Sequence, residues 1–125
     1  MRAKIRWFHS PDVYDLEKYA PDDPEDVGVF IQVMVGDEDS PGEESFDLEV
    51  VTPKHLIEHV KRDGPLIGRG FVIVARWNWP EIRDFLTGAF ESEQAPTWDE
   101  LGERLGRIGH WEFEDYRELP QGDGT

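Results

Sequence analysis

The chain has no cysteine, few basic residues and no long apolar run, and each absence removes a class of function. Without cysteine it can form neither disulfides nor thiolate metal sites, as is usual in a reducing compartment. The longest apolar run, residues 71–75, is too short to cross a bilayer. Residues 1–7 include basic side chains, but no apolar segment follows them, so we expect no signal peptide. These features predict a soluble cytoplasmic protein.

The scarcity of basic residues leaves a strongly acidic chain. Thirteen lysines and arginines stand against 28 aspartates and glutamates, which gives a formal net charge of −15. Between Ser10 and Pro53 there are 14 acidic residues and one basic residue, Lys18. A field of one sign on loops repels nucleic acid and anionic membranes and attracts basic protein surfaces. Acidity also keeps a small protein in solution, so solubility alone is the competing interpretation.

Length and composition predict a single domain. The 125 residues are 38% hydrophobic and 12% aromatic, which suffices for one packed core and argues against wholesale disorder. We expect one α+β domain over residues 1–119 and a flexible tail over residues 120–125.

Hydrophobic periodicity predicts the elements of this domain. Alternating or β-branched segments predict five strands, at residues 3–9, 28–35, 45–51, 71–75 and 110–116. The second and third should form a hairpin around an acidic loop, and the fourth, apolar on both faces, should be central. The fold class that follows is α+β, an antiparallel or mixed sheet of about five strands with two to three helices packed on one face.

Capping signals predict the helices. Thr52 can serve as an N-cap with Pro53 at the first helical position. A second helix should open at residues 77–80, and the capping-box pattern of residues 97–100 should open a third. A single helical turn is also expected near residues 13–19.

One string suggests metal chemistry. His55, Glu58 and His59 match the H-x-x-E-H string of inverted zinc peptidases, and histidines four apart share a helix face. Such enzymes need a third ligand from another helix and a substrate cleft, neither of which the sequence indicates. Surface or structural histidines are therefore the favoured interpretation, with a small metal-dependent hydrolase as the alternative. No nucleophile elbow, phosphate-binding loop or EF-hand spacing is present, so we predict no catalytic residue, cofactor or resident metal.

Tryptophan is abundant for a small domain, and most of these residues stand at the ends of predicted elements. The favoured interpretation is a core rim or a helix staple. The alternative is that one or two aromatic residues anchor a protein interface, where tryptophan and tyrosine carry much of the binding energy. Trp79 and Tyr116 are the candidates for that role.

A longer stretch, residues 36–56, resembles the signature of the immunity protein 8 family of bacterial polymorphic toxin systems. The signature consists of a strand ending in glycine, an acidic loop, Phe-x-hydrophobic-x-Val-x-Thr-Pro and a helix beginning with leucine. Residues 97–98 and 111–116 also fit this layout, so the resemblance spans nearly the whole chain. It implies a protein that binds and neutralises the toxin of its own cell, and it provides no site residues to carry over.

The resemblance and the charge lead to one hypothesis. Many such toxins are nucleases with basic surfaces, so the expected partner is a cognate toxin, with a basic nuclease as one candidate, and neither nucleic acid nor a membrane. An acidic scaffold or a nucleic-acid mimic is the alternative, and the oligomeric state stays open. The residues expected at the contact are Asp22, Asp23, Glu25, Asp26, Asp37, Glu38, Asp39, Glu43, Glu44, Trp79 and Tyr116.

Overall fold

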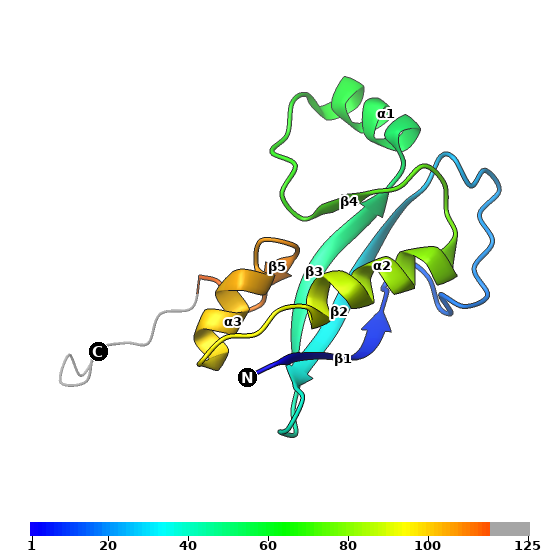
Figure 1. Ribbon diagram of the computed structural model, residues 1–125. Helices are drawn as coiled ribbons and strands as arrows, with labels where there is room; N and C mark the ends of the chain where they lie inside the picture. Colours follow the sequence, from blue (N-terminus) through cyan, green and yellow to red (C-terminus); the bar gives the residue numbers. More distant parts are fainter. Residues whose placement is uncertain (116–125) are drawn as a thin grey trace.

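The computed structural model describes residues 1–115 and shows a five-stranded mixed sheet with three helices (Figure 1). The elements follow one another as β1 (Ala3–His9), β2 (Gly28–Asp37), β3 (Glu44–Val51), α1 (Pro53–Asp63), β4 (Phe71–Ile73), α2 (Trp79–Glu91), α3 (Trp98–Leu105) and β5 (His110–Trp111). The sheet order is β1-β2-β3-β4. Only the β3–β4 pair is parallel, and β5 pairs with β3 further along the same edge. The α+β class predicted from the sequence is therefore confirmed.

The β2–β3 hairpin is the centre of the sheet and forms as predicted. Both strands extend further toward the turn than expected, because β2 continues to Asp37 and β3 begins at Glu44. Gly42 closes the turn with φ of 101°, a conformation that L-residues with a side chain rarely adopt. Alternate side chains of the two strands point to opposite faces of the sheet.

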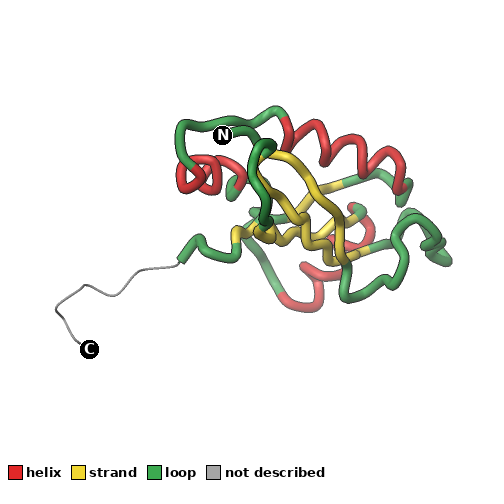
Figure 2. The backbone as a smooth tube through the Cα atoms, turned by 90° about the horizontal axis from the view of Figure 1, so that it is seen from below, coloured by secondary structure: helices red, strands yellow, loops and turns green. Residues whose placement is uncertain are grey.

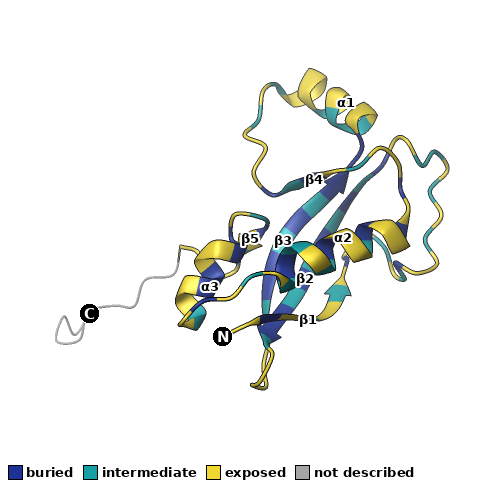
Figure 3. Cartoon of the chain, viewed as in Figure 1, coloured by how far each residue is buried: buried dark blue, intermediate teal, exposed yellow. Residues whose placement is uncertain are grey.

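One face of this hairpin is covered by α2 and α3. Its side chains are between 0 and 2% exposed and come from Val29, Ile31, Val33, Val35, Phe46, Leu48 and Val50 (Figure 3). The two helices bury Ile82, Leu86, Phe90, Leu101 and Leu105 in the same core. We call this side of the sheet the covered face. Two helices thus pack on one face, within the range that the sequence predicts.

Helix α1 lies on the opposite side of the sheet, beyond one end of the hairpin (Figure 2). Gly28 faces away from the core, and a Cβ atom on it would lie only 2.4 Å from Nε2 of His55. No residue of α1 is fully buried. The helix therefore closes one end of the second face, and no other helix of the described residues covers the rest of that face, most of whose residues are partly exposed.

Three local predictions are wrong. Strand β4 ends at Ile73 and lies at the edge, where Ile73 is 60% exposed, because β4 and β5 share the outer side of β3. Strand β5 has two residues, since Glu114 N donates to Trp111 O and turns the chain. Residues 13–19 contain no helix, and within them residues 16–18 form a turn in which Lys18 N donates to Asp15 O. Tyr116 and the predicted tail over residues 120–125 lie outside the described residues.

The helix starts follow the capping signals, with one difference. Asn78 accepts a hydrogen bond from Glu81 N, and Thr97 accepts one from Glu100 N. Thr52 occupies the N-cap of α1, but its hydroxyl accepts from Val27 N at 3.0 Å and makes no cap bond. That buried contact ties the start of α1 to the segment that precedes β2.

Candidate functional site

The two acidic stretches lie at opposite ends of the β2–β3 hairpin (Figure 1). Residues 22–26, which we call the entry loop, precede β2, and residues 37–43, the hairpin loop, connect β2 to β3. The ten residues of β2 separate them by about 30 Å at roughly 3.3 Å per residue. The carboxylates expected at the contact therefore form two groups and not one patch.

The hairpin loop is held together by hydrogen bonds and keeps its charge. The Asp37 carboxylate accepts from Arg2 N at 3.1 Å and from the Ser40 hydroxyl at 2.9 Å, and these bonds lower the pKa of Asp37. Nη2 of Arg6 donates to the backbone oxygens of Asp37 and Ser40, both at 2.7 Å. The loop is thus ordered without any of its carboxylates forming an ion pair within the described residues.

Glu43 connects the hairpin loop to the bare side of the sheet. Its carboxylate accepts a hydrogen bond of 2.8 Å from Nε1 of Trp7. Trp7 pairs with Met34 in the β1–β2 register, so its ring lies on the face that α2 and α3 do not cover. The neighbouring Glu38 and Asp39 are exposed to solvent.

Glu44 belongs to the interior of the fold. Its Oε1 accepts two hydrogen bonds, one of 2.7 Å from Nε1 of Trp98 and one of 2.9 Å from Nε1 of Trp111. The residue is half-buried at the start of β3, on the covered face opposite Val35. We therefore leave Glu44 out of the proposed contact surface.

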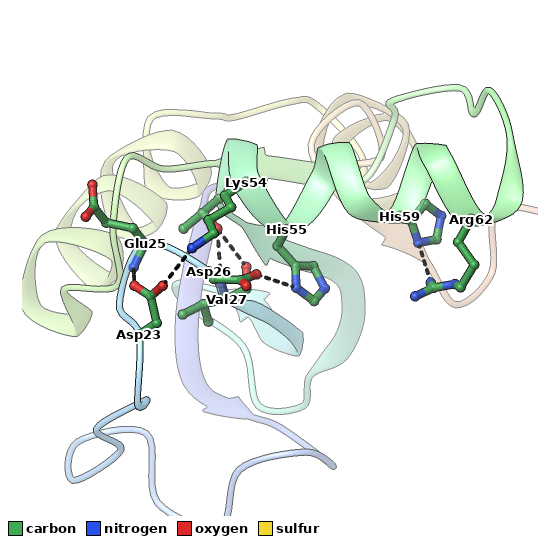
Figure 4. Close-up of polar contacts among 9 residues, drawn as sticks. Asp23, Glu25, Asp26, Val27, Lys54, His55, His59 and Arg62 are labelled. Atoms are coloured by element: carbon green, nitrogen blue, oxygen red, sulfur yellow. Dashed lines mark hydrogen bonds and ion pairs between the residues drawn. The ribbon is translucent and has the colours of Figure 1, made fainter.

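Some carboxylates of the entry loop pair with side chains of α1 (Figure 4). Asp23 accepts from Glu25 N at 2.9 Å and pairs with Lys54 Nζ at 3.0 Å, and both contacts lower its pKa, the backbone bond most. Asp26 Oδ1 lies 3.3 Å from Nδ1 of His55. Two carboxylates of this loop thus have partners on α1.

Asp22 and Glu25 are the exposed acids of the entry loop that pair with no cation in the described part of the chain. The entry loop therefore presents less uncompensated charge than the hairpin loop. This difference could not be read from the sequence, where the two stretches look alike.

The H-x-x-E-H string does not assemble a metal centre. His55 faces Gly28 and Asp26, whereas Nδ1 of His59 lies 3.3 Å from Nη2 of Arg62 (Figure 4). Glu58 is exposed. Among residues 1–115 there is no group of three or more histidine, cysteine or acidic residues placed to hold a metal ion. Each histidine instead lies beside charged side chains, His55 beside Asp26 of the entry loop and His59 beside Arg62 and Asp63 of α1.

Trp79 lies in the core. It is 5% exposed, its ring contacts Phe8 edge-on at 5.1 Å, and its Nε1 donates to Glu17 at 3.1 Å. Trp79 thus matches the core-rim interpretation and offers no surface to a partner. The other candidate anchor, Tyr116, lies outside the described residues.

Sequence reasoning missed a larger surface, the bare face of the sheet. We call it the open face, and its exposed or partly exposed residues are Trp7, His9, Phe30, Gln32, Met34, Asp47 and Glu49, whereas Ser45 and Val51 lie on the same side and are buried. The alternation of residues 45–51 already separates Asp47 and Glu49 from the apolar side chains between them. The sequence could not show that this second face lacks a covering helix.

Asp47 is the least satisfied group on the open face. Its Oδ1 is buried and has no hydrogen-bond partner, which is uncommon for a buried polar atom. Burial raises the pKa of the Asp47 carboxyl, and the opposing effects of Gln32 and His110 are smaller. An ionised carboxylate is therefore held here at a cost to folding.

A comparison with protein families decides what kind of protein carries these features. The family described as immunity protein 8 matches residues 3–116. The chain belongs to the immunity protein 8 family. Comparisons with curated proteins and with solved structures gave no match.

Family membership establishes the general role. Immunity proteins are non-enzymatic inhibitors that bind a cognate toxin and neutralise it. The alternative of a metal-dependent hydrolase built on His55, Glu58 and His59 is therefore not supported. None of the described helices of this immunity protein is long and apolar enough to span a membrane. The family alone does not specify which toxin this protein binds or through which surface.

Proposed function

We propose that this immunity protein neutralises its toxin by binding a basic surface of it through carboxylates centred on the hairpin loop. The observation that carries the proposal is the lack of cationic partners for the carboxylates of Asp37, Glu38, Asp39 and Glu43. None of the four forms an ion pair with a lysine, arginine or histidine of the described chain. Four carboxylates without an ion-pair partner in the described chain outnumber the one guanidinium, that of Arg6, which lies against this ordered turn, and they create a negative potential that a cationic surface can satisfy.

The physical role of these charges is to guide association. Complementary potentials can raise an association rate constant from about 10⁵–10⁶ to about 10⁸–10⁹ M⁻¹s⁻¹ at low salt. Exposed charges are screened over about 8 Å at physiological ionic strength, so this gain should shrink steeply as salt is added. A rapid encounter suits an inhibitor that must reach a toxin before the toxin acts.

The charge also favours one class of toxin. A nuclease must hold phosphates, and it does so with lysine and arginine side chains on its active surface. A chain with a net charge of −15 is complementary to such a surface. We therefore propose a basic nuclease as the toxin. Entry-loop residues Asp22 and Glu25 would extend the negative field at the far end of the hairpin.

The experiment begins with capture of the toxin from the producing bacterium at low ionic strength, followed by its identification and purification. The association rate constant is then measured against salt for the wild type and for the double variant Glu38→Lys, Asp39→Lys. We expect the variant to associate at least about tenfold more slowly at low salt, with a shallower salt dependence.

A matched control separates local charge from net charge. Asp84→Lys with Glu103→Lys changes the net charge equally, at exposed positions of α2 and α3 on the other side of the molecule. We expect this control to slow association by less than about threefold. Equal effects of the two double variants would show that the hairpin loop is not where the toxin approaches.

A further inference from the structure

The open face is organised in rows that run across the strands. In the β1–β2–β3 register, Trp7 is beside Met34, His9 is beside Gln32 and Asp47, and Phe30 is beside Glu49. Residues directly opposite each other in antiparallel strands share a face, so these side chains form one continuous surface. It extends from the hairpin loop to the start of α1.

This surface has the composition of a protein interface. Trp7 is 48% exposed, and Phe30 and Met34 are each partly exposed beside it. Aromatic residues and methionine are enriched at the centres of interfaces, where a few of them supply most of the binding energy. Beyond the row of Phe30, the edge-strand residue Ile73 adds further exposed apolar surface.

The middle of the open face is negatively charged. Asp47 and Glu49 stand two residues apart on β3 and point to the same side. Neither forms an ion pair with another described residue. The nearest titratable neighbour across the strands is His110, and its Nδ1 is already 2.9 Å from Glu114.

The cationic groups close to this face are committed elsewhere. Arg6 lies against Gly36 at the hairpin end, and its guanidinium donates to backbone oxygens of the hairpin loop. Lys54 at the other end pairs with Asp23. No lysine or arginine of the described chain pairs with Asp47 or Glu49, and His110 already contacts Glu114, so a permanent positive charge to match the two carboxylates has to be supplied by a partner.

We infer that the toxin docks on the open face and places a cationic side chain, arginine or lysine, against Asp47 and Glu49. The inference rests on the proposed function, because it identifies where the toxin stays bound after the hairpin loop has guided it in. The hydrogen bond from Trp7 to Glu43 joins the two surfaces, so one partner can contact both. A bound cation would also compensate the carboxylate of Asp47, whose buried oxygen lacks a donor.

The first test uses the captured toxin and two pairs of variants. Asp47→Asn and Trp7→Ala alter the open face, whereas Asp84→Asn and Phe85→Ala are matched controls on α2, where Phe85 is 60% exposed. We expect each open-face variant to raise Kd at least about tenfold, mainly through faster dissociation. The controls should change Kd by less than about twofold.

The outcomes separate this inference from the proposed function. Binding that depends on the hairpin loop and ignores Asp47 and Trp7 would refute docking on the open face and leave the acidic steering intact. Binding that depends on Asp47 and Trp7 but not on the hairpin loop would support docking on the open face and refute the acidic steering. Asp47→Asn should not lower the stability of the fold, so a loss of binding in that variant cannot be attributed to unfolding.

A second test needs no toxin. N-acetylarginine amide is titrated into the labelled protein, and backbone amide signals are followed by NMR, with N-acetylglutamine amide as the neutral control. We expect saturable shifts at Gln32, Asp47 and Glu49 with the arginine derivative alone, and their loss in Asp47→Asn. Shifts confined to the hairpin loop, or equal shifts with both probes, would overturn the assignment of a cation-binding position to Asp47.

Discussion

The two faces of the β2–β3 hairpin differ in what covers them. On the covered face, Ile31, Val33 and Phe46 are fully excluded from solvent beneath α2 and α3 (Figure 3). On the open face, the residues between them in sequence are partly exposed, and α1 reaches only one end. The same two strands thus supply the core with one set of side chains and solvent with the other. We therefore expect variants of the open face to change recognition with little effect on stability.

The contrast follows from the helices. Both α2 and α3 bury apolar residues that match the covered face, whereas α1 has no fully buried residue with which to seal the open face. Variants that act on one face should leave the other unaffected. Variants of the covered face should have the largest effects on stability, and variants of exposed residues the smallest.

The largest loss of stability should come from the covered face. Phe46 is 0% exposed and its ring lies 6.0 Å from that of Phe90 and 6.2 Å from that of Trp111. Phe46→Ala should lower the free energy of unfolding by about 3–5 kcal/mol, measured by urea denaturation. The toxin affinity of the folded fraction should stay unchanged. A loss below about 1 kcal/mol would mean that the covered face is not the stabilising core.

A smaller loss is expected at Glu44, which lies on the covered face of the hairpin. Glu44→Leu would leave the indole N–H groups of Trp98 and Trp111 without their acceptor, which should lower the free energy of unfolding by about 2 kcal/mol. Glu44→Gln keeps an acceptor oxygen and should retain most of the stability. Equal stability of these two variants in chemical denaturation would argue against an internal role for Glu44.

The third prediction concerns the pH dependence of stability at Asp47. Burial raises the pKa of this carboxyl, so the folded protein holds the proton more tightly than the unfolded chain. The contribution of Asp47 to the stability of the wild type should therefore fall as pH rises from about 4 through the raised value. Asp47→Asn lacks this titration and should gain relative stability toward pH 7.

The gain at Asp47 should stay below about 1 kcal/mol, because the side chain is partly exposed and solvent screens its charge. Denaturation of both proteins at pH 4 and pH 7 provides the comparison. If the variant lost relative stability as pH rose, the carboxylate would be favourably paired in the folded state and not an unpaired group.

The smallest effects on stability should come from exposed aromatics on either side of the molecule. Trp7→Ala and Phe85→Ala should each change the free energy of unfolding by less than about 1 kcal/mol, because neither ring is buried. Only the first should weaken toxin binding. A large loss of stability in Trp7→Ala would show that the open face also contributes to the core.

Much of the fold follows from local sequence patterns. Alternation predicts β2 and β3, and the capping residues Asn78 and Thr97 stand where α2 and α3 begin. The edge position of β4 could not be predicted, since an apolar run looks the same in a central and in an edge strand. The edge position of β4 is decided by strand pairing, because β4 and β5 both pair with the outer side of β3.

The candidate site was less accessible to sequence reasoning. Glu44 looks like its neighbour Glu43 in an acidic run, yet its acceptor role depends on indoles that follow 54 and 67 residues later. Trp79, an expected anchor, is buried because Phe8 and other core residues enclose it. The exposure of a side chain depends on all the segments that pack around it, including those distant in sequence.

The sequence by itself determined the net charge, the alternation of the strands and the capped starts of the helices, because these depend on residues close together in the chain. Only the tertiary structure decided which face of the sheet stays uncovered and which carboxylates find partners. The physical reason is that coverage and compensation of charge arise from segments distant in sequence, such as α1 reaching one end of the open face and Lys54 reaching Asp23.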